Sequence, residues 1–366
     1  MIRILHLVSS LSIRSGVMSV IMNYYRNINT DKIQFDFCYF VDREDTYEAE
    51  INSLGGRVFK ITKPSLSRSF KNELNDFFEK QKNVYTTLHI HEVYLTFLFA
   101  PIAKKNGIKN VITHSHATMY SDKKLNALRN RVLCIGLKKH ADYYYACSMA
   151  AGQFLYGKKY LEEGKVNVIN NAIDCEKYKF DLNTRNYIRQ KLELKGYLVI
   201  GNVGRFNEQK NHSFLVDIFY SIKQKEEKVK LLLVGDGPLI QSVKNKVKKL
   251  NLNNDVIFLG RRNDIPHLLC AMDIFLLPSL FEGLPVVGVE AQASGLPIVL
   301  SDTITEEIGL LNYKYIDLEK TPEYWAKEIL SIKQDNSRNQ AYLAVKEKGF
   351  DIKQEAKKLE KIYLEM

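Results

Sequence analysis

The sequence has no paired cysteine motif and no long apolar run. Its five cysteines are scattered, without the C-x-x-C spacing that zinc sites and redox motifs use, so we expect reduced thiols packed in the core. The longest strongly apolar stretch, residues 93–103, is well short of the roughly 20 residues needed to cross a bilayer. The first residues resemble a buried strand and lack the cleavage pattern of a secretory signal. We therefore expect a cytoplasmic protein.

The positive charge is unevenly distributed. The whole chain has a net charge of +11, and residues 1–178 carry 25 basic and 17 acidic side chains, which leaves +8 in the first half. Such an excess favours a polyanionic partner or an anionic membrane surface. A nucleic-acid-binding protein is one alternative, but the chain has no recognised module and few aromatic residues within its basic runs. We expect no nucleic-acid partner.

Both halves alternate short apolar, β-branched runs with stretches of helical period, which is the pattern of βαβ units and parallel sheets. The strands expected in the first half are IRILHLV, FDFCYF, RVFKI, VYTTLHIH, NVITHSH, YYYACS and VNVIN. Those expected in the second half are YLVIGNVG, KLLLVGD, VIFLG, DIFLLPS and LPIVLSD. Residues 170–181 interrupt the alternation, and 366 residues exceed one ordinary core. We predict two doubly wound α/β domains, residues 1–178 and 179–349.

Ligands of open parallel sheets bind beyond the carboxyl ends of the strands, so the loops there are the candidate sites. Arg205 and Lys210 lie between one such strand and a helix that is expected to begin near Asn211. Two cations beside a helix N-terminus favour a diphosphate, although a solvated basic loop would look the same. In a second turn, Gly235 and Gly237 would let the backbone approach a ligand, or would simply make a tight turn.

Two carboxylates, Glu282 and Glu290, accompany the predicted helix in LFEGLPVVGVEAQASGLPIVLSD. On a helix this step separates them by about 12 Å along the axis and about 80° around it, so they cannot share one proton-transfer site. They could instead accept hydrogen bonds from hydroxyls at both ends of a nucleotide sugar, with loop N–H groups at the diphosphate. The alternative is a helix-capping Glu282 and a solvated Glu290. The apolar neighbours of Glu290 favour burial, which requires a partner.

The motifs RFNEQKN, LLLVGDGPL and VIFLGRRNDIPHLLCAMDIFLLPSLFEGLPVVGVEAQASGLPIVLSD, in this order and spacing, resemble glycosyltransferase family four. These are retaining enzymes of the GT-B fold, and the similarity is greatest to bacterial capsular and exopolysaccharide enzymes. It covers nearly the whole chain and is strongest over residues 201–302. The resemblance implies two Rossmann-like domains that face a central cleft, the first binding the acceptor and the second the nucleotide-sugar donor. It also implies a C-terminal helix, residues 350–366, that crosses back to the first domain.

The resemblance further implies the residues of the donor site. In the first half, Gly16 stands where the family has a pair of glycines, and its backbone would approach the donor phosphate, whereas close approach at Ser15 is not implied. In the second half, Arg205 and Lys210 would bind the pyrophosphate, Glu290 the ribose and Glu282 the sugar hydroxyls. The amides of Gly283 and Leu284 would lie beside the sugar and phosphate. Arg261 and Arg262 would lie near the base, with Gly235 in the adjacent turn.

Two histidine pairs end predicted strands: His89 and His91 in HIHE, and His114 and His116 in HSH. Alternate residues of a strand share a face, so a zinc site is one interpretation. No further cysteine or histidine is fixed by spacing to complete such a set, and we predict no metal. The resemblance instead implies that His116, or else His114, lies near the reacting carbon of the donor sugar. Its backbone carbonyl would face the developing oxocarbenium ion.

Residues 122–140 predict an amphipathic helix with Leu125, Leu128, Val132 and Ile135 on one face. Its cations are Lys123, Lys124, Arg129, Arg131, Lys138 and Lys139. We expect the apolar stripe to pack in the core beneath a solvated charged face. The alternative is docking on an anionic membrane beside a lipid-linked acceptor.

The function implied is that of a retaining hexosyltransferase in capsular or extracellular polysaccharide synthesis. It would move a hexose or N-acetylhexosamine from a nucleotide sugar, expected to be UDP-linked, to a lipid-linked saccharide, with peripheral contact at the inner face of the cell membrane. No cofactor is expected, because the two cations and helix N-termini can neutralise the departing diphosphate without a metal. The alternatives are a nucleotide-sugar epimerase on the same fold and a catalytically silent partner subunit of a glycosyltransferase.

Overall fold

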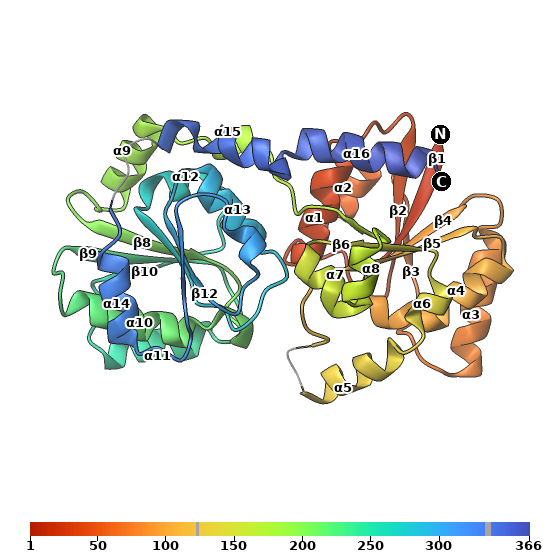
Figure 1. The fold of residues 1–366 in the computed structure, drawn as a ribbon, viewed down its shortest axis with the longest axis horizontal. Helices are drawn as coiled ribbons and strands as arrows, with labels where there is room; N and C mark the ends of the chain where they lie inside the picture. Colours follow the sequence, from red (N-terminus) through yellow and green to blue (C-terminus); the bar gives the residue numbers. More distant parts are fainter. Residues whose placement is uncertain (122–123, 334–337) are drawn as a thin grey trace. The chain divides into compact units, whose positions relative to one another are not determined.

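The computed structural model describes residues 1–121, 124–333 and 338–366 and divides into two compact units (Figure 1). The first unit comprises Met1–Ala172 and Ile352–Met366, and the second comprises Ile173–Asp351. The predicted boundary residue Tyr178 lies within the second unit, at the end of the 3-10 helix η2 (Cys175–Tyr178). There its hydroxyl donates a hydrogen bond of 2.6 Å to Glu290 of the same unit.

A seven-stranded parallel sheet of order β3-β2-β1-β4-β5-β6-β7 forms the first unit. Its strands are β1 (Ile2–Leu7), β2 (Ile33–Tyr39), β3 (Val58–Lys60), β4 (Thr87–Ile90), β5 (Asn110–Ser115), β6 (Tyr143–Ala146) and β7 (Val166–Val168). Its helices are α1 (Gly16–Tyr25), α2 (Glu48–Ser53), α3 (Arg68–Lys80), α4 (Thr96–Lys105), α5 (Lys124–Leu133), α6 (Leu137–His140), α7 (Met149–Tyr156), α8 (Lys158–Glu162) and α16 (Ile352–Leu364). The strand order reverses between β1 and β4, which is where such sheets open a ligand crevice.

Helices cover both faces of this sheet. On one face, Phe70 and Leu74 of α3 pack with Phe99 of α4 in a buried apolar cluster. On the other, α16 lies beside α1, and the ring of Tyr363 meets Phe35 edge-on at 5.8 Å (Figure 1). The last helix of the chain is therefore part of the first unit.

The second unit contains a six-stranded parallel sheet of order β10-β9-β8-β11-β12-β13. The strands are β8 (Leu198–Val203), β9 (Val229–Val234), β10 (Val256–Gly260), β11 (Ile274–Leu277), β12 (Ile298–Ser301) and β13 (Tyr313–Ile316). The α-helices are α9 (Leu182–Lys191), α10 (His212–Lys223), α11 (Ile240–Lys249), α12 (Ile265–Ala271), α13 (Val286–Ala293), α14 (Pro322–Leu330) and α15 (Ala341–Val345). Here the order reverses between β8 and β11.

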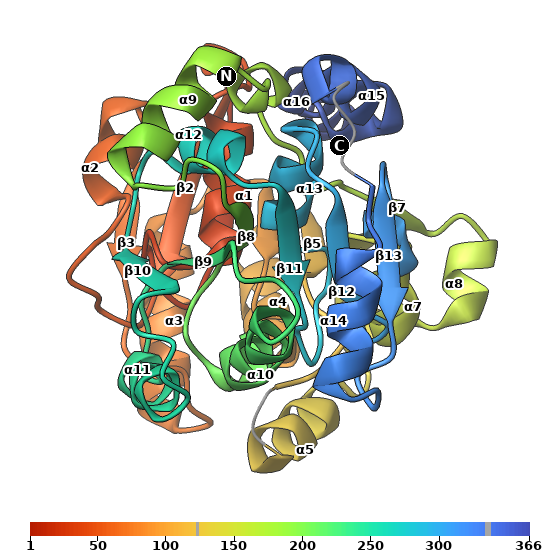
Figure 2. The same ribbon diagram turned by 90° about the vertical axis from the view of Figure 1, so that its left-hand side faces the viewer.

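Figure 1 shows α12 and α13 on one face of this second sheet and α10, α11 and α14 on the other. Helices α10 and α14 lie side by side (Figure 2), and Phe214 meets the fully buried Trp325 edge-on at 5.8 Å. The prediction of two doubly wound domains is confirmed. Strand β13 was not predicted, because this short edge strand is only partly buried and lacks a continuous apolar run.

The expectation for the apolar stripe of residues 122–140 is wrong. Leu125, Leu128, Val132 and Ile135 are all exposed rather than packed in the core. The inward position of α5 is taken by Asn130, which is buried and donates a hydrogen bond of 2.9 Å to the Tyr120 carbonyl. Asp122 and Lys123, at the start of the predicted helix, lie outside the described residues.

The helical spacing used for Glu282 and Glu290 is also wrong. Helix α13 begins only at Val286, with Pro285 as its N-cap, and Glu282 lies in an isolated parallel β-bridge with Ile304. Proline lacks the N–H of an ordinary residue and often begins a helix, which separates the extended Glu282 segment from α13. The axial and angular separation calculated for an ideal helix therefore does not describe the two carboxylates.

The loops that follow β8 and β9 approach each other closely. Gly235 has a φ of +136°, and a Cβ atom there would lie 2.0 Å from the carbonyl oxygen of Gly204. A Cβ on Gly237 would lie 2.4 Å from the carbonyl oxygen of Phe206. These two glycines are thus required for packing between the loops, a role that the sequence left open.

Replacement of Gly235 by alanine should destabilise the second unit by about 3 kcal/mol or more, since both the backbone conformation and the contact become unfavourable. The control is Gly196→Ala, at a φ of +81° with nothing within 4 Å of the added Cβ. It should lose only about 1–2 kcal/mol from backbone strain. Urea unfolding followed by fluorescence of Trp325, the only tryptophan, measures both. Equal losses would contradict the close approach.

Candidate functional site

In the second unit, the loops after β8 and β11 are joined at the point where the strand order reverses. The Lys210 ammonium lies 2.6 Å from Oε1 of Glu282, and both side chains are largely buried. Gln209 supports the pair, because its side-chain amide donates to Oε2 of Glu282 (3.2 Å) and to the carbonyl of Phe281 (3.0 Å). The structure thus brings together two residues that the sequence placed in one donor site.

Local capping holds Lys210 in place. The side chain of Asn207 accepts a hydrogen bond from the Lys210 amide at 3.2 Å, at the start of the 3-10 helix η3 (Glu208–Lys210). Asn211 then adopts a left-handed conformation, φ +52°, which asparagine tolerates better than most residues, and α10 follows. An ammonium has three donors, so the contact with Glu282 leaves donors for an anion. Arg205, in the same loop, is exposed and has no ion-pair partner among the described residues.

Glu290 has a different environment from Glu282. It lies on α13, and its Oε1 accepts a hydrogen bond from the Tyr178 hydroxyl. Burial raises the pKa of Glu290, while the hydrogen bond from Tyr178 opposes that shift. This tyrosine is the partner that a buried carboxylate requires. A carboxylate can accept several hydrogen bonds, so Glu290 retains acceptor capacity.

The remaining predicted donor residues lie in loops at strand ends. Gly283 and Leu284 are buried between Glu282 and α13. After β10, Arg262 forms a bidentate pair with Asp264, at 2.6 and 2.8 Å, which lowers the pKa of that carboxyl. Its neighbour Arg261 is exposed.

In the first unit, Gly16 begins α1 after Ser15, whose hydroxyl caps the helix by accepting a hydrogen bond from the Met18 amide. A Cβ on Gly16 would meet nothing within 4 Å. Packing in this structure therefore does not require glycine at that position.

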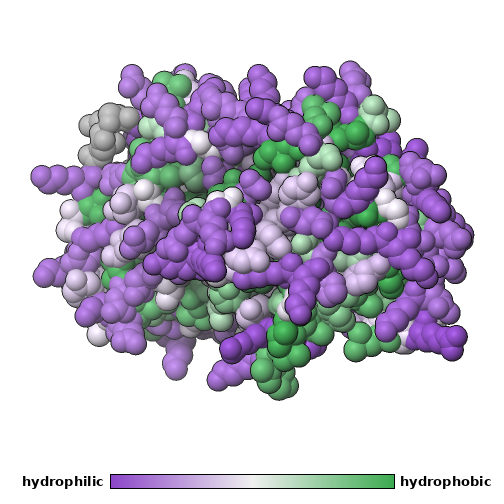
Figure 3. Space-filling view, turned by 45° about the vertical axis from the view of Figure 1, so that its right-hand side comes forward, coloured by the Kyte–Doolittle hydropathy of each residue, from purple (hydrophilic) through white to green (hydrophobic). Residues whose placement is uncertain are grey.

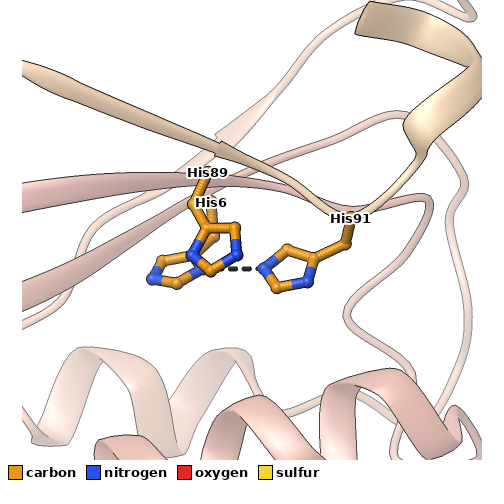
Figure 4. Close-up of side chains that lie close together, drawn as sticks. All are labelled: His6, His89 and His91. Carbon is orange, nitrogen blue, oxygen red and sulfur yellow. Dashed lines mark hydrogen bonds between the residues drawn. The ribbon is translucent and has the colours of Figure 1, made fainter. Parts of the chain in front are cut away.

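The first unit gathers five histidines at the reversal between β1 and β4, a group that we call the histidine cluster. Its members are His6, His89, His91, His114 and His116. His6 and His89 are neighbours in the paired strands β1 and β4, and a hydrogen bond of 3.0 Å joins Nδ1 of His6 to Nε2 of His91 (Figure 4). The rings stack, with centroids 4.1 Å apart for His114 and His116 and 4.3 Å apart for His89 and His91.

Two hydrogen-bonded chains run through the histidine cluster. In one, Nδ1 of His91 pairs with Nε2 of His116 at 2.8 Å, so that His6, His91 and His116 form a series. In the other, the Tyr363 hydroxyl pairs with Nδ1 of His89 (2.7 Å), whose Nε2 pairs with Nδ1 of His114 (3.1 Å). A neutral imidazole has one donor and one acceptor nitrogen, so the tautomers along each chain are coupled.

Burial keeps the histidine cluster neutral. Desolvation lowers the pKa of His6 and of His116 to about 3, and it lowers the pKa of His89, His91 and His114 well below the ordinary value. A neutral imidazole can bind a transition metal. Ring nitrogens of His6, His89 and His91, and of His91, His114 and His116, lie within 4.8 Å of one another, so either trio could hold an ion.

A pocket of about 230 Å³ lies beside His91 and His116. Glu92 and Asn130 also line it, and the Glu92 carboxylate accepts a hydrogen bond of 3.1 Å from the Ser9 amide. Burial raises the pKa of Glu92. The pocket combines neutral imidazoles, a carboxylate and an amide, a set able to hydrogen-bond a polyhydroxylated ligand.

Several residues of these groups were not found from the sequence, among them Gln209 beside Glu282. His6 and Tyr363 complete the histidine cluster from positions far along the chain, and Tyr178 pairs with Glu290 across 112 residues. The one available signal was for His6, which lies two residues before the end of the predicted strand IRILHLV, as His89 and His114 lie two residues before the ends of theirs. The tyrosines carried no pattern that marks such a role.

Comparison with known proteins identifies relatives along the whole chain. Residues 184–348 match the family model described as "Glycosyl transferases group 1". A Bacillus subtilis protein named "Putative glycosyltransferase EpsF" is 35% identical over 340 residues, covering 89% of this chain and 86% of that protein. An Escherichia coli "UDP-Gal:alpha-D-GlcNAc-diphosphoundecaprenol alpha-1,3-galactosyltransferase" is 27% identical over 319 residues, 82% of this chain and 81% of that one.

The fold is also found among solved structures. Anabaena Alr3699/HepE, crystallised in complex with UDP and glucose, superimposes with a TM-score of 0.80 over 100% of both chains at 20% identity. The expected GT-B architecture of two doubly wound parallel-sheet domains is thereby confirmed.

Stability should depend on pH through the histidine cluster. Because the folded pKa of His6 is about 3, against 6.5 as the ordinary value, the unfolded chain binds protons that the folded chain does not. The stability contributed by neutral histidines should be complete above about pH 6.5 and should fall as the pH drops towards 3, by up to about 1.4 kcal/mol per pH unit for each histidine. Urea unfolding followed by circular dichroism at about pH 7.5 and about pH 5 measures this.

The matched control is His6→Phe, since the His6 ring already packs near the rings of Phe35 and Phe37, with centroid distances of 4.3 and 5.4 Å. Removal of one buried imidazole should flatten the pH dependence, whatever it does to stability at neutral pH. An unchanged slope would show that His6 is not held neutral.

Proposed function

Because the chain belongs to the group 1 glycosyltransferase family, we propose that it is a retaining hexosyltransferase that uses a UDP-linked sugar and a lipid-linked saccharide acceptor. The sugar would be a hexose or an N-acetylhexosamine. The observation that carries the proposal is the Lys210–Glu282 pair at the reversal point of the second sheet, beside the exposed Arg205. It combines cations for a diphosphate with a carboxylate for sugar hydroxyls.

The named relatives support the choice of donor and acceptor. The Escherichia coli relative is named for UDP-galactose and a diphosphoundecaprenol acceptor, and a Staphylococcus aureus relative, 25% identical over 381 residues, is named as a capsular polysaccharide biosynthesis glycosyltransferase. The Anabaena structure contains UDP. We therefore propose a role in capsular or extracellular polysaccharide synthesis, with peripheral contact at a membrane surface.

In the proposed reaction, the bond between the anomeric carbon and the diphosphate breaks while a bond to the acceptor oxygen forms on the same face. The acceptor proton would pass to the departing phosphate oxygen. Lys210 and Arg205 would stabilise the charge on that diphosphate, a contribution that grows as the bond breaks. Glu282 would hold the sugar hydroxyls and Glu290 the ribose. His116 would lie near the reacting carbon.

The remaining predicted residues would act around these contacts. The amides of Gly283 and Leu284, before the N-terminus of α13, would meet the sugar and phosphate, where a helix N-terminus favours anions. The base would lie near Arg261 and Arg262, and Gly16 would approach the phosphate from the first unit.

Calorimetric titration with nucleotides and nucleotide sugars tests the donor site. UDP should bind, and Arg205→Ala and Glu290→Ala should each weaken binding by about 1–3 kcal/mol, the loss expected for a hydrogen bond to a charged group. A matched control is Arg68→Ala, an exposed arginine of α3 outside the site. Full UDP affinity in both site variants would refute the assignment, and no binding of any nucleotide would refute the transferase proposal.

Transfer should not require a metal ion, since Lys210 and Arg205 can supply the positive charge at the diphosphate. We expect sugar transfer from the UDP-sugar to be unchanged after treatment with EDTA and dialysis. As a control, adding Mg²⁺ or Zn²⁺ to the treated protein should not increase the rate of sugar transfer. Activity that is lost with EDTA and restored by Zn²⁺ would favour a metal in the histidine cluster instead.

A further inference from the structure

Helix α5 presents an apolar stripe to solvent. Leu125, Leu128 and Val132 are 86%, 62% and 55% exposed, and Ile135, directly after the helix, is 74% exposed. They follow one another at steps of three, four and three residues, which puts them on one side of the segment. Figure 3 shows apolar side chains gathered at the lower edge of the molecule, over α5. Contiguous exposed apolar surface of this kind indicates a binding partner.

The charge around this stripe specifies the chemistry of the partner. Lys124, Arg131, Lys138 and Lys139 are exposed, and residues 124–140 contain no acidic side chain. A second copy of the same surface would bring these cations face to face, which is unfavourable. An anionic bilayer satisfies both features, because leucine and valine side chains enter the acyl boundary while lysine and arginine contact the lipid phosphates.

The opposite side of α5 borders the candidate site. Asn130 and Cys134 line the pocket that also contains His91 and His116. The guanidinium of Arg129 lies 5.7 Å from the ring of Tyr94, which lines the same pocket. The helix is therefore solvent-exposed and apolar on one side and part of the pocket wall on the other.

We propose that α5 and the residues that follow it to His140 dock the first unit on an anionic membrane, with the stripe inserted at the interface. This position would put the pocket beside His116 at the boundary where the saccharide of a lipid-linked acceptor lies. The purpose of docking rests on the proposed function, whereas vesicle binding itself does not. Within residues 1–121, 124–333 and 338–366, no helix has the length and apolar character needed to span a bilayer.

Co-sedimentation of the full chain with vesicles tests the proposal. The protein should bind vesicles that contain phosphatidylglycerol, bind pure phosphatidylcholine vesicles at least tenfold more weakly, and lose affinity as salt is raised. The double variant Leu125→Asp, Leu128→Asp and the triple variant Lys124→Ala, Arg131→Ala, Lys139→Ala should each bind anionic vesicles at least tenfold more weakly. These side chains are exposed, so the fold should be unaffected.

The matched control is Leu182→Asp with Tyr187→Asp on α9, where the two side chains are 58% and 62% exposed. This variant should bind vesicles as the unchanged chain does. Equal vesicle binding by the α5 variants, or no preference for anionic lipid, would overturn the proposal. So would a dimer in sedimentation velocity that the Leu125→Asp, Leu128→Asp variant abolishes, since the occupant would then be a second copy.

Calorimetry with UDP separates this proposal from the proposed function. The α5 variants should retain UDP affinity, because the donor residues lie in the second unit. Vesicle binding without UDP binding would refute the transferase assignment and leave docking intact. UDP binding without vesicle binding would refute docking alone.

Discussion

Burial of polar side chains at the carboxyl ends of parallel strands is the constraint on which both units depend. Apolar strands must be covered on both faces by helices, which leaves only the strand ends open to a ligand. Polar groups at those ends lose water and must therefore pair within the protein. Lys210 pairs with Glu282 in the second unit, and the five histidines pair with one another and with Tyr363 in the first.

The two carboxylates near α13 meet this constraint differently. Glu282 is paired with a cation, and Glu290 accepts a hydrogen bond from a neutral hydroxyl. The Lys210 ammonium, 2.6 Å from Oε1, compensates the negative charge of Glu282. The tyrosine supports Glu290 less strongly, which is consistent with the raised pKa of that carboxyl. Fixed partners also hold both groups in position, a preorganisation that the proposed donor binding would use.

The sequence predicted the architecture better than it predicted the partners of the buried polar groups. Apolar period and glycine-rich turns identify strands such as β8 and β11, because these signals are local. The partners of the buried groups are not local: His89 and Tyr363 are 274 residues apart, and Tyr178 and Glu290 are 112 apart. The predicted start of α13 was wrong because the helical period of the sequence extends N-terminally of the helix itself. Pro285 and the β-bridge of Glu282 keep that preceding segment outside the helix.

Helix α5 shows a further limit of sequence patterns. Amphipathic period identifies the apolar side of a helix, but it contains no information on whether protein or another phase covers that side. In α5 the protein covers the side of Asn130, so the apolar side remains available. The other side of α5 forms the pocket wall. Any partner that covers the stripe must therefore also restrict the motion of this wall. By thermodynamic linkage, a ligand that fits the pocket better when α5 is restricted would in turn strengthen binding of that partner.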